Sequence, residues 1–175
     1  MITRGRVRLR SVRRDDLPAL WALFGDDLEL QSLVSDRPPT PRSFERLVGQ
    51  YEDELRHEPR PTFVVEADGD VVGRCELHSV DQYSRRCEVG IALGREHRGK
   101  GYGQEAVRAL VEYAFRHLNM NRVWLQVLAH DARAVAAYRR AGFVEEGRLR
   151  GHSWHDGRYR DVLVMAVLRD EPPAG

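Results

Sequence analysis

The period of apolar and polar positions changes several times along the chain, and each change predicts a new element. Val7 and Leu9 alternate with arginines, a pattern typical of a strand. Apolar side chains then recur at helical spacing over 17–24 and again over 44–55. A Thr-Pro pair at 40–41 has the residue types that favour an N-cap and the first position of a helix. The N-terminal part therefore predicts one strand followed by two amphipathic helices.

From Thr62 onward the period becomes two. Alternation extends over 62–67, 71–80 and 87–93, and polar turn residues separate these stretches. Strands joined by such short turns pair with their neighbours in the chain. This region therefore predicts an antiparallel meander of three strands.

The rest of the chain predicts two helices and three strands. The apolar stripe over 107–118 is the clearest helical pattern, and the 122–128 segment is a strand that is apolar on both faces. Asp131 can cap a short helix that extends to Arg140. A hairpin over 148–168, which turns at His155-Asp156-Gly157, completes the order β-α-α-β-β-β-α-β-α-β-β.

Length and composition agree with one mixed α/β domain. The chain has 175 residues, 42% of them apolar and 31% charged, which is enough to form a core without disulfide or metal cross-links. We expect residues 1–170 to form this domain and residues 171–175 to fray. Cys75 and Cys87 are expected to be reduced thiols that pack as small apolar groups.

Charge excludes some partners. The 28 Lys and Arg residues nearly balance the 27 Asp and Glu residues, so bulk charge does not favour nucleic acid or an anionic membrane. The apolar run from Val162 to Leu168 is far too short to span a bilayer, and no apolar stretch follows the N-terminal arginines. We therefore expect a cytoplasmic protein. His152, His155 and Asp156 are explained by a hairpin turn, and no metal is expected.

A glycine-rich loop carries the clearest chemical signal. Arg98-Gly-Lys-Gly-Tyr-Gly103 lies between a predicted strand and the strongest predicted helix. Free backbone N–H groups and the positive end of the helix dipole converge there, and glycines leave room for a phosphate. The loop therefore predicts an anion cradle. The alternative is a glycine turn that only lets the helix pack.

Two known phosphate motifs do not fit this loop. Gly94-Arg-Glu-His-Arg-Gly99-Lys100 copies most of a Walker A loop, but Gly101 replaces the Ser or Thr that would hold magnesium. A dinucleotide fingerprint would need a third glycine where the chain has Gln104. Neither a triphosphate site nor a dinucleotide site is therefore expected.

The remaining R-x-x-G-x-G pattern belongs to a wider set of matching segments. They are Glu88-Val-Gly-Ile-Ala-Leu, the glycine loop with its helix, Val123-Trp-Leu-Gln-Val, Ala134-Val-Ala-Ala-Tyr-Arg-Arg-Ala-Gly-Phe143, Glu145-Glu-Gly-Arg and Asp156-Gly-Arg-Tyr-Arg-Asp161. Together they make the chain resemble the GNAT superfamily of N-acetyltransferases, and within it the RimJ/RimL-like branch that acetylates ribosomal-protein N-termini. The resemblance implies a mixed, mostly antiparallel central sheet flanked by helices.

The resemblance also implies how acetyl-CoA would bind. Backbone amides of Arg98, Gly99, Lys100, Gly101, Tyr102 and Gly103 would hold the pyrophosphate. The strand backbone at Ile91 and Leu93 would pair with the pantetheine arm, and an N–H near Ile91 or Ala92 would receive the oxyanion. Asp131 replaces the asparagine usual in the family, so a contact with the cofactor and a plain helix cap are equal alternatives.

Two residues are candidates for catalysis. Tyr138, seven residues after Asp131, resembles the family tyrosine that faces the cofactor sulfur and would protonate the leaving thiolate. The alternative for Tyr138 is a core aromatic. Glu88 is the candidate base, against the alternatives of a solvated strand-end charge and of a water chain that replaces a base.

The sequence therefore predicts an acyl-CoA-dependent N-acetyltransferase whose acceptor is a protein or peptide N-terminal amine. Alternatives are acetylation of a small amine, such as a polyamine, an amino acid or an aminoglycoside, and a non-catalytic acyl-CoA-binding module. Acidic residues over 26–29 and 52–54 favour a cationic acceptor. Acetyl-CoA and the amine are the expected partners, a homodimer stays open, and neither nucleic acid nor a membrane is expected.

Overall fold

The strands form one eight-stranded sheet in the order β1-β2-β3-β4-β5-β6-β8-β7. The computed structural model describes residues 1–25, 27–29, 31, 39–40, 43–57 and 60–171. The strands are β1 (Ile2–Arg4), β2 (Val7–Ser11), β3 (Thr62–Ala67), β4 (Asp70–Asp81), β5 (Arg86–Leu93), β6 (Arg122–Leu128), β7 (Val144–His155) and β8 (Arg158–Leu168). The predicted mixed, mostly antiparallel sheet flanked by helices is confirmed.

Only one neighbouring pair in the sheet is parallel. The pairing of β5 with β6 extends from Arg86↔Arg122 to Glu88↔Trp124, although both strands continue beyond it. The other neighbours are antiparallel. The sheet therefore opens between the C-terminal halves of β5 and β6.

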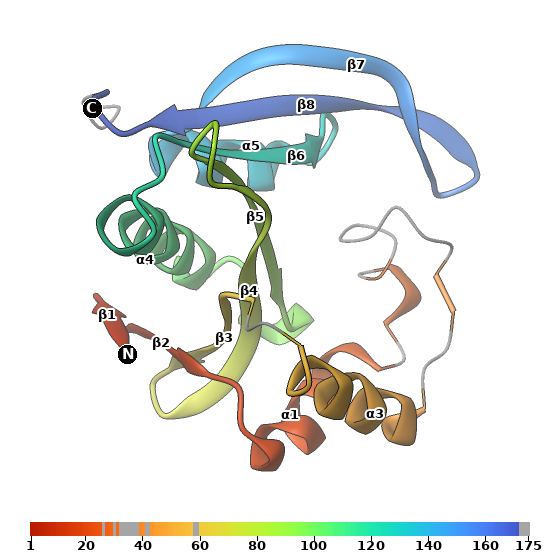
Figure 1. Cartoon of the computed structure of the whole chain (residues 1–175). Coiled ribbons are helices and arrows are strands. Elements are labelled where there is room, and N and C mark those ends of the chain that lie inside the picture. Colours follow the sequence, from red (N-terminus) through yellow and green to blue (C-terminus); the bar gives the residue numbers. More distant parts are fainter. Residues whose placement is uncertain (26, 30, 32–38, 41–42, 58–59, 172–175) are drawn as a thin grey trace.

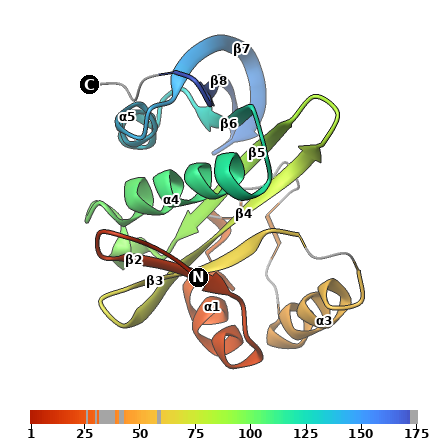
Figure 2. The same ribbon diagram turned by 60° about the vertical axis from the view of Figure 1, so that its left-hand side comes forward.

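Helices cover both faces of the sheet around this opening. They are α1 (Leu17–Phe24), α3 (Phe44–Glu54), α4 (Tyr102–His117) and α5 (Ala132–Arg140), with short 3-10 helices at Arg14–Asp16 and Arg95–His97. Figure 1 shows α4 on one side of β4 and β5, and α1 with α3 on the other side. The rotated view in Figure 2 shows the same arrangement.

The main core lies between the sheet and α4. Ala106, Leu110 and Ala114 recur along α4 and are inaccessible to solvent. They pack with the odd-numbered side chains of β4 and β5, such as Leu77 and Cys87. Because side chains of a strand alternate between faces, Arg74, Glu76 and His78 of β4 point to the side of α1 and α3.

Element boundaries differ from the predicted ones at three places. A short strand, β1, precedes the predicted first strand and pairs with β2 across a turn at Gly5. Helix α3 begins at Phe44, and its N-cap is Ser43, whose Oγ accepts a hydrogen bond from the Arg46 N–H at 3.3 Å. The predicted cap at Thr40 is therefore wrong, because a serine closer to the apolar stripe supplies that bond; Pro41 lies outside the described residues.

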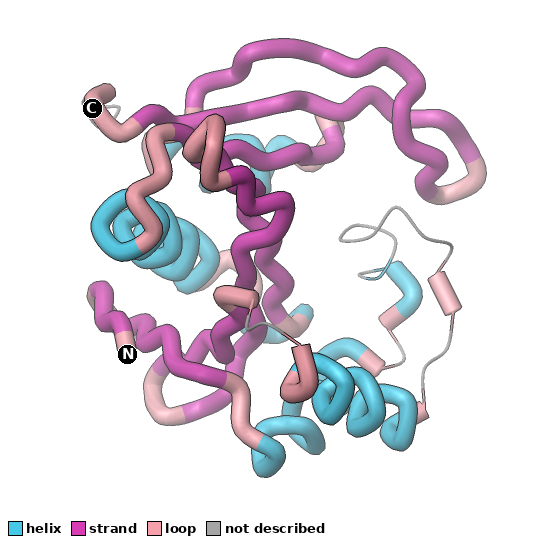
Figure 3. Tube along the Cα trace, in the orientation of Figure 1, coloured by secondary structure: helices cyan, strands magenta, loops and turns pink. Residues whose placement is uncertain are grey.

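The C-terminal hairpin is longer than predicted. β7 begins at Val144 instead of Arg148, because this edge strand is exposed along most of its length and shows no period of two. Its pairing with β8 shifts register between Glu145 and Gly147 and between Leu149 and Ser153, and such irregularities bend a strand. Figure 3 shows the resulting curved hairpin. Residues 172–175 of the expected frayed tail lie outside the described residues.

Candidate active site

The glycine loop leads directly into the N-terminus of α4. Gly99 and Gly101 have φ angles of +80° and +87°, a conformation that favours glycine. A Cβ added at either residue would meet no heavy atom within 4 Å, so both glycines border open space. Gly101 is the N-cap and offers no side chain to the first N–H groups of the helix. These donors are therefore available to an anion.

A cleft of about 380 Å³ opens beside this loop, where β5 and β6 separate. It is lined by Ile91, Ala92, Leu93, Arg98, Gly99, Gly101, Gly103, Gln104, Val107, Gln126, Val127, Leu128, Asp131, Arg133, Ala134, Ala137, Tyr138 and Arg140. The structure thus brings together most of the residues that sequence reasoning assigned to the cofactor. We call this space the cofactor cleft.

Arg98 contributes a half-buried cation to the cleft. Its Nε donates to the Leu93 carbonyl at 3.1 Å, and its Nη2 lies 3.8 Å from the Asp27 carboxylate. The same Nη2 is buried and makes no hydrogen bond with any residue in the described ranges. Arg98 therefore brings a half-buried guanidinium, partly balanced by Asp27, to the cleft beside the glycine cradle, where a pyrophosphate could bind.

Strand geometry assigns free backbone groups on β5. The Gly94 N–H donates to the Val72 carbonyl of β4 at 3.0 Å. Because N–H directions alternate along an antiparallel strand, the N–H of Ala92 also points to β4, whereas those of Ile91 and Leu93 point toward β6. At this level β6 has already diverged. Ile91 is therefore the better placed of the two residues considered for the oxyanion.

The side chains of Lys100 and Tyr102 lie outside the cofactor cleft. The Tyr102 hydroxyl donates to Asp68, which raises the pKa of Tyr102, and the Arg6 guanidinium lies 4.7 Å from the centre of the ring. Arg6 also donates to the Lys100 carbonyl at 3.4 Å. Only the backbone groups of these two residues are therefore candidates for the cofactor, and their outer contacts tie the loop to the β1–β2 turn and the β3–β4 turn.

Asp131 and Tyr138 lie on the opposite wall of the cleft, at and within α5. The Asp131 carboxylate accepts a hydrogen bond from the Ala134 N–H at 2.9 Å, so Asp131 caps the helix. Burial and, to a smaller extent, the Asp131 charge raise the pKa of Tyr138 to about 12. The ring packs edge-on against Phe143 at 6.0 Å. Tyr138 is therefore a phenol that keeps its proton at any physiological pH.

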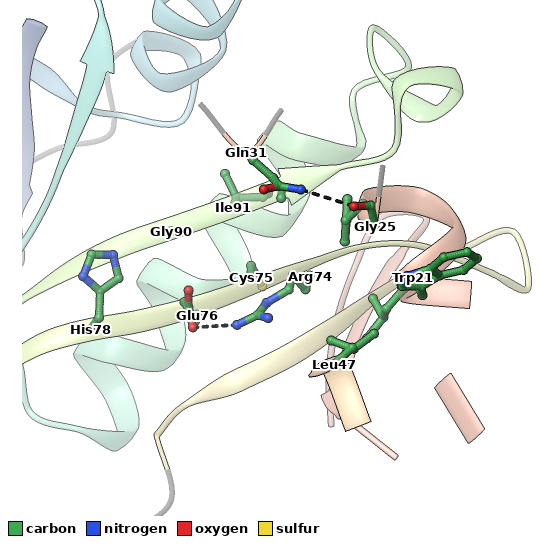
Figure 4. A pocket seen from close by; sticks show the side chains of 13 residues that line it. Trp21, Gly25, Gln31, Leu47, Arg74, Cys75, Glu76, His78, Gly90 and Ile91 are labelled. Carbon is green, nitrogen blue, oxygen red and sulfur yellow. Dashed lines mark hydrogen bonds and ion pairs between the residues drawn. The ribbon is translucent and has the colours of Figure 1, made fainter. Parts of the chain in front are cut away.

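A second cavity, of about 270 Å³, lies on the side of α1 and α3. It is lined by Leu20, Trp21, Phe24, Gly25, Gln31, Leu47, Arg74, Cys75, Glu76, His78, Gly90, Ile91 and Ala92. Figure 4 shows that α1 and α3 supply apolar side chains, whereas β4 supplies Arg74, Glu76 and His78. We call this space the acceptor cavity.

Sequence reasoning missed the three polar residues of β4. Arg74, Glu76 and His78 alternate with the buried residues Gly73, Cys75 and Leu77, and that alternation was the signal that could have found them. Arg74 Nη2 donates to Glu76 at 3.0 Å. A Cβ at Gly90 would lie 3.4 Å from His78 Nε2, so the imidazole lies over this glycine.

Glu88 does not line either cavity. Its carboxylate lies 3.5 Å from His78 Nδ1, and its side chain is only 16% exposed. His78, in contrast, lines the acceptor cavity. A proton from an amine in that cavity would therefore meet His78 first, with Glu88 behind it.

The two cavities meet at the same two residues. Ile91 and Ala92 line both the cofactor cleft and the acceptor cavity. The cleft lies between α4 and α5, and the cavity lies under α1 and α3, on the other side of β5. A ligand in each could therefore place its reactive end beside Ile91.

The acidic residues of the N-terminal helices already have partners. Arg95 pairs with Asp27 and Glu29, at 3.5 and 2.8 Å, and Arg14 pairs with Glu52 at 2.8 Å. Asp26 lies outside the described residues. These ion pairs weaken the expectation that this acidic stretch attracts a cationic acceptor, because the charges of Asp27, Glu29 and Glu52 are partly balanced within the chain.

Neither a membrane helix nor a metal cluster is found where the structure describes the chain. No described helix is long and apolar enough to cross a bilayer. His, Cys, Asp and Glu side chains among these residues form no group of three or more that could hold a metal ion. Cys75 and Cys87 are buried free thiols, and burial raises the pKa of both.

Comparison with known proteins adds independent observations. Residues 6–144 match the model of the acetyltransferase (GNAT) domain family. The chain is 30% identical over 167 residues to the spermidine N(1)-acetyltransferase of Vibrio cholerae, covering 95% of each chain. A crystal structure of spermidine N-acetyltransferase from Vibrio cholerae, in complex with CoA and spermine, superposes with a TM-score of 0.84 at 30% identity and covers 94% of this chain and 96% of that one.

One relative of the ribosomal type also matches, over a shorter region. The putative ribosomal N-acetyltransferase YdaF of Bacillus subtilis is 35% identical over 104 residues, which cover 59% of this chain and 57% of that protein. The comparisons therefore do not confirm the RimJ/RimL-like branch.

Proposed function

Since the chain belongs to the GNAT acetyltransferase family, we propose that it transfers the acetyl group of acetyl-CoA to a primary amine of a small linear polyamine. Membership of the family makes it an N-acetyltransferase that uses acetyl-CoA. The acceptor is the part that we propose. Similarity to spermidine acetyltransferases over nearly the whole chain favours the small-amine alternative over the peptide N-terminus that the sequence analysis placed first.

The meeting of two cavities at Ile91 and Ala92 carries the proposal. Acetyl-CoA supplies an activated thioester, and the cofactor cleft offers it a glycine cradle and a narrow gap between strands. The acceptor cavity combines an apolar wall at Trp21 and Leu47 with the carboxylate of Glu76, which Arg74 already contacts at 3.0 Å. An alkyl amine would lay its methylene chain on the apolar wall, and its cation would compete with Arg74 for Glu76.

Deprotonation is the main chemical demand of such an acceptor. An alkyl amine has an ordinary pKa of about 10.4, so its neutral form costs about 4.6 kcal/mol at pH 7. An N-terminal α-amino group has a pKa of about 7.7–8.0, so its deprotonation at pH 7 costs far less free energy. His78, supported by Glu88, is placed to take this proton on the acceptor side of the sheet.

The remaining roles fall to residues of the cofactor cleft. The Ile91 N–H would donate to the oxygen of the acetyl group as negative charge develops there. Tyr138 would donate its phenolic proton to the leaving thiolate. Arg98 and the loop glycines would hold the pyrophosphate and thereby fix the position of the thioester.

A panel of acceptors tests the proposal. Release of CoA thiol is measured with acetyl-CoA and spermidine, spermine, putrescine, or tetrapeptides with basic, neutral and acidic N-terminal sequences. We expect kcat/KM for at least one polyamine to exceed that for every peptide at least tenfold, with the acetylated amine identified by mass spectrometry. A peptide that is the better acceptor would overturn the polyamine and restore the N-terminal amine. A homodimer remains a separate proposal, which light scattering would test.

A further inference from the structure

Two arginines of α5 line the mouth of the cofactor cleft without a carboxylate partner. Arg133 and Arg140 are both exposed and both line the cleft. Within the segments that the structure describes, neither forms an ion pair. Arg139, next to Arg140 on the same helix, instead pairs with Glu145 at 3.0 Å. The cleft therefore has two guanidinium groups whose charge nothing in these segments balances.

Helix geometry places the two arginines in one row. Residues 133, 137 and 140 follow each other at intervals of four and three, so they share one face of α5. Ala137 between them has a short side chain, and the two ends of the row are about 10 Å apart along the axis. Ala134 and Tyr138 form the neighbouring row and are less exposed. The arginines thus form the outer edge of the wall that carries Tyr138.

Contacts with α4 hold this edge beside the glycine loop. Arg140 Nε donates to the Gln104 side chain at 3.3 Å, and Gln104 lies in the first turn of α4. Arg108, on the next turn, donates to the Arg140 carbonyl. Figure 2 shows α4 and α5 as neighbours. The outer row of α5 therefore faces the same mouth as the anion cradle.

CoA carries more phosphate than the glycine loop can bind. The loop and the N-terminus of α4 account for the pyrophosphate, but the ribose of CoA bears a separate 3′-phosphate with about two negative charges. Arginine binds phosphate through two parallel N–H···O bonds, and it is the preferred residue for that geometry. The α5 edge supplies two exposed arginines that line the same cleft as the loop.

We propose that Arg133 and Arg140 bind the 3′-phosphate of CoA and make the enzyme distinguish CoA from 3′-dephospho-CoA. The inference rests on the proposed use of acetyl-CoA, and not on the identity of the amine. It adds a specificity contact to a site that would otherwise recognise only groups shared by both nucleotides.

Calorimetric titration of the full chain with CoA and with 3′-dephospho-CoA tests the assignment. We expect the unmodified protein to bind CoA at least tenfold more tightly, a difference of about 1.4 kcal/mol. In the double variant Arg133→Gln/Arg140→Gln this ratio should fall to twofold or less, while the Kd for 3′-dephospho-CoA changes less than twofold. The two single variants would show how the contact is divided.

Arg139→Gln is the matched control, because it removes the same charge from the same helix outside the cleft. This variant should bind CoA as much more tightly than 3′-dephospho-CoA as the unmodified protein does. Equal affinity of the unmodified protein for both nucleotides, or an unchanged ratio in the double variant, would overturn the assignment. An equal loss of affinity for CoA and 3′-dephospho-CoA in the double variant would overturn the assignment as well, since the arginines would then contact the pyrophosphate. Failure of the unmodified protein to bind CoA would overturn the cofactor cleft itself.

Discussion

Glu88 and His78 face each other across the β4–β5 ladder, with a carboxylate oxygen 3.5 Å from His78 Nδ1. The other ring nitrogen, Nε2, lies near Gly90, on the way to the junction of the two cavities at Ala92. A carboxylate on Nδ1 fixes the tautomer and orientation of an imidazole. We propose that His78 takes a proton from the acceptor; Glu88 is then close enough to stabilise the resulting charge.

Replacing Glu88 should weaken this proton transfer. We expect Glu88→Gln to lower kcat/KM for a polyamine about tenfold at pH 7, and His78→Gln to lower it about a hundredfold. Both deficits should shrink toward pH 10, because more of the amine is then neutral in solution. The measurement is a pH profile of thiol release. A deficit that does not vary with pH would make the pair structural.

The glycine cradle should not tolerate an acidic side chain. Gly101→Asp should weaken acetyl-CoA binding at least tenfold, about 1.4 kcal/mol, because a carboxylate would occupy the place of the phosphate and repel it. Gly157→Asp is the control, since Gly157 also has a positive φ and open space around its Cβ but lies at the tip of the β7–β8 hairpin. Calorimetry on both folded variants decides, and similar affinities for the two would remove the loop from the cofactor site.

Tyr138 should be needed for turnover and not for binding. Tyr138→Phe keeps the ring that packs on Phe143, so we expect the Kd of acetyl-CoA to stay within twofold while kcat falls about a hundredfold. Because burial raises the pKa of Tyr138 to about 12, kcat of the unmodified enzyme should not decline between pH 8 and pH 10 from loss of this proton. Unaltered kcat in the variant, where chemistry limits the rate, would make Tyr138 a packing residue.

Asp131 has two alternative roles, as a helix cap and as a contact of the cofactor. Because its carboxylate accepts from the Ala134 N–H, we expect Asp131→Ala to lower the free energy of unfolding by about 1 kcal/mol, and Asp131→Asn to preserve it. The Kd of CoA should change less than twofold in both. Denaturant titration and calorimetry provide the two readouts. A tenfold change in Kd for Asp131→Asn would show that the residue also contacts the cofactor.

The buried thiols should limit stability at alkaline pH. Burial raises the pKa of Cys75 and raises that of Cys87 to about 11. Because the thiol pKa is higher in the folded state than in the unfolded state (about 8.5), ionisation of the thiol favours unfolding. The stabilisation is fully present below pH 8.5 and is lost as pH rises from there through the folded-state pKa. We expect Tm to fall between pH 8.5 and pH 11, and to fall less in Cys87→Ala. Native protein should also not react with a disulfide reagent at pH 8, and rapid labelling would show that the thiols are accessible.

Most elements of this fold could be predicted because their signals are local. The period of two over 62–93 and the apolar stripe of α4 predict the meander and the long helix before any contact is known. The glycine loop by itself predicts an anion cradle. Together with the other matching segments it makes the chain resemble the N-acetyltransferases that use acetyl-CoA, and the comparisons confirm the enzyme class and this co-substrate. The residues assigned to the loop stay predictions until binding is measured.

The acceptor side could not be predicted, because it depends on register and on distant partners. His78 and Glu88 meet only because β4 and β5 pair in one particular register. The acids of the N-terminal helices looked free in the sequence, yet Asp27 and Glu29 pair with Arg95, more than sixty residues away. The chain pattern gives neither fact. The peptide N-terminus was the first expectation because the chain resembles the RimJ/RimL-like branch, which the comparisons do not confirm.

Where β5 separates from β6, the two faces of the described sheet share the lining residues Ile91 and Ala92. Acetyl-CoA and the amine would enter from opposite faces of the sheet, so neither would block the access route of the other. Free CoA and the acetylated product could then depart by separate routes and in either sequence. Such a layout would let the two substrates bind in either order and react directly with each other.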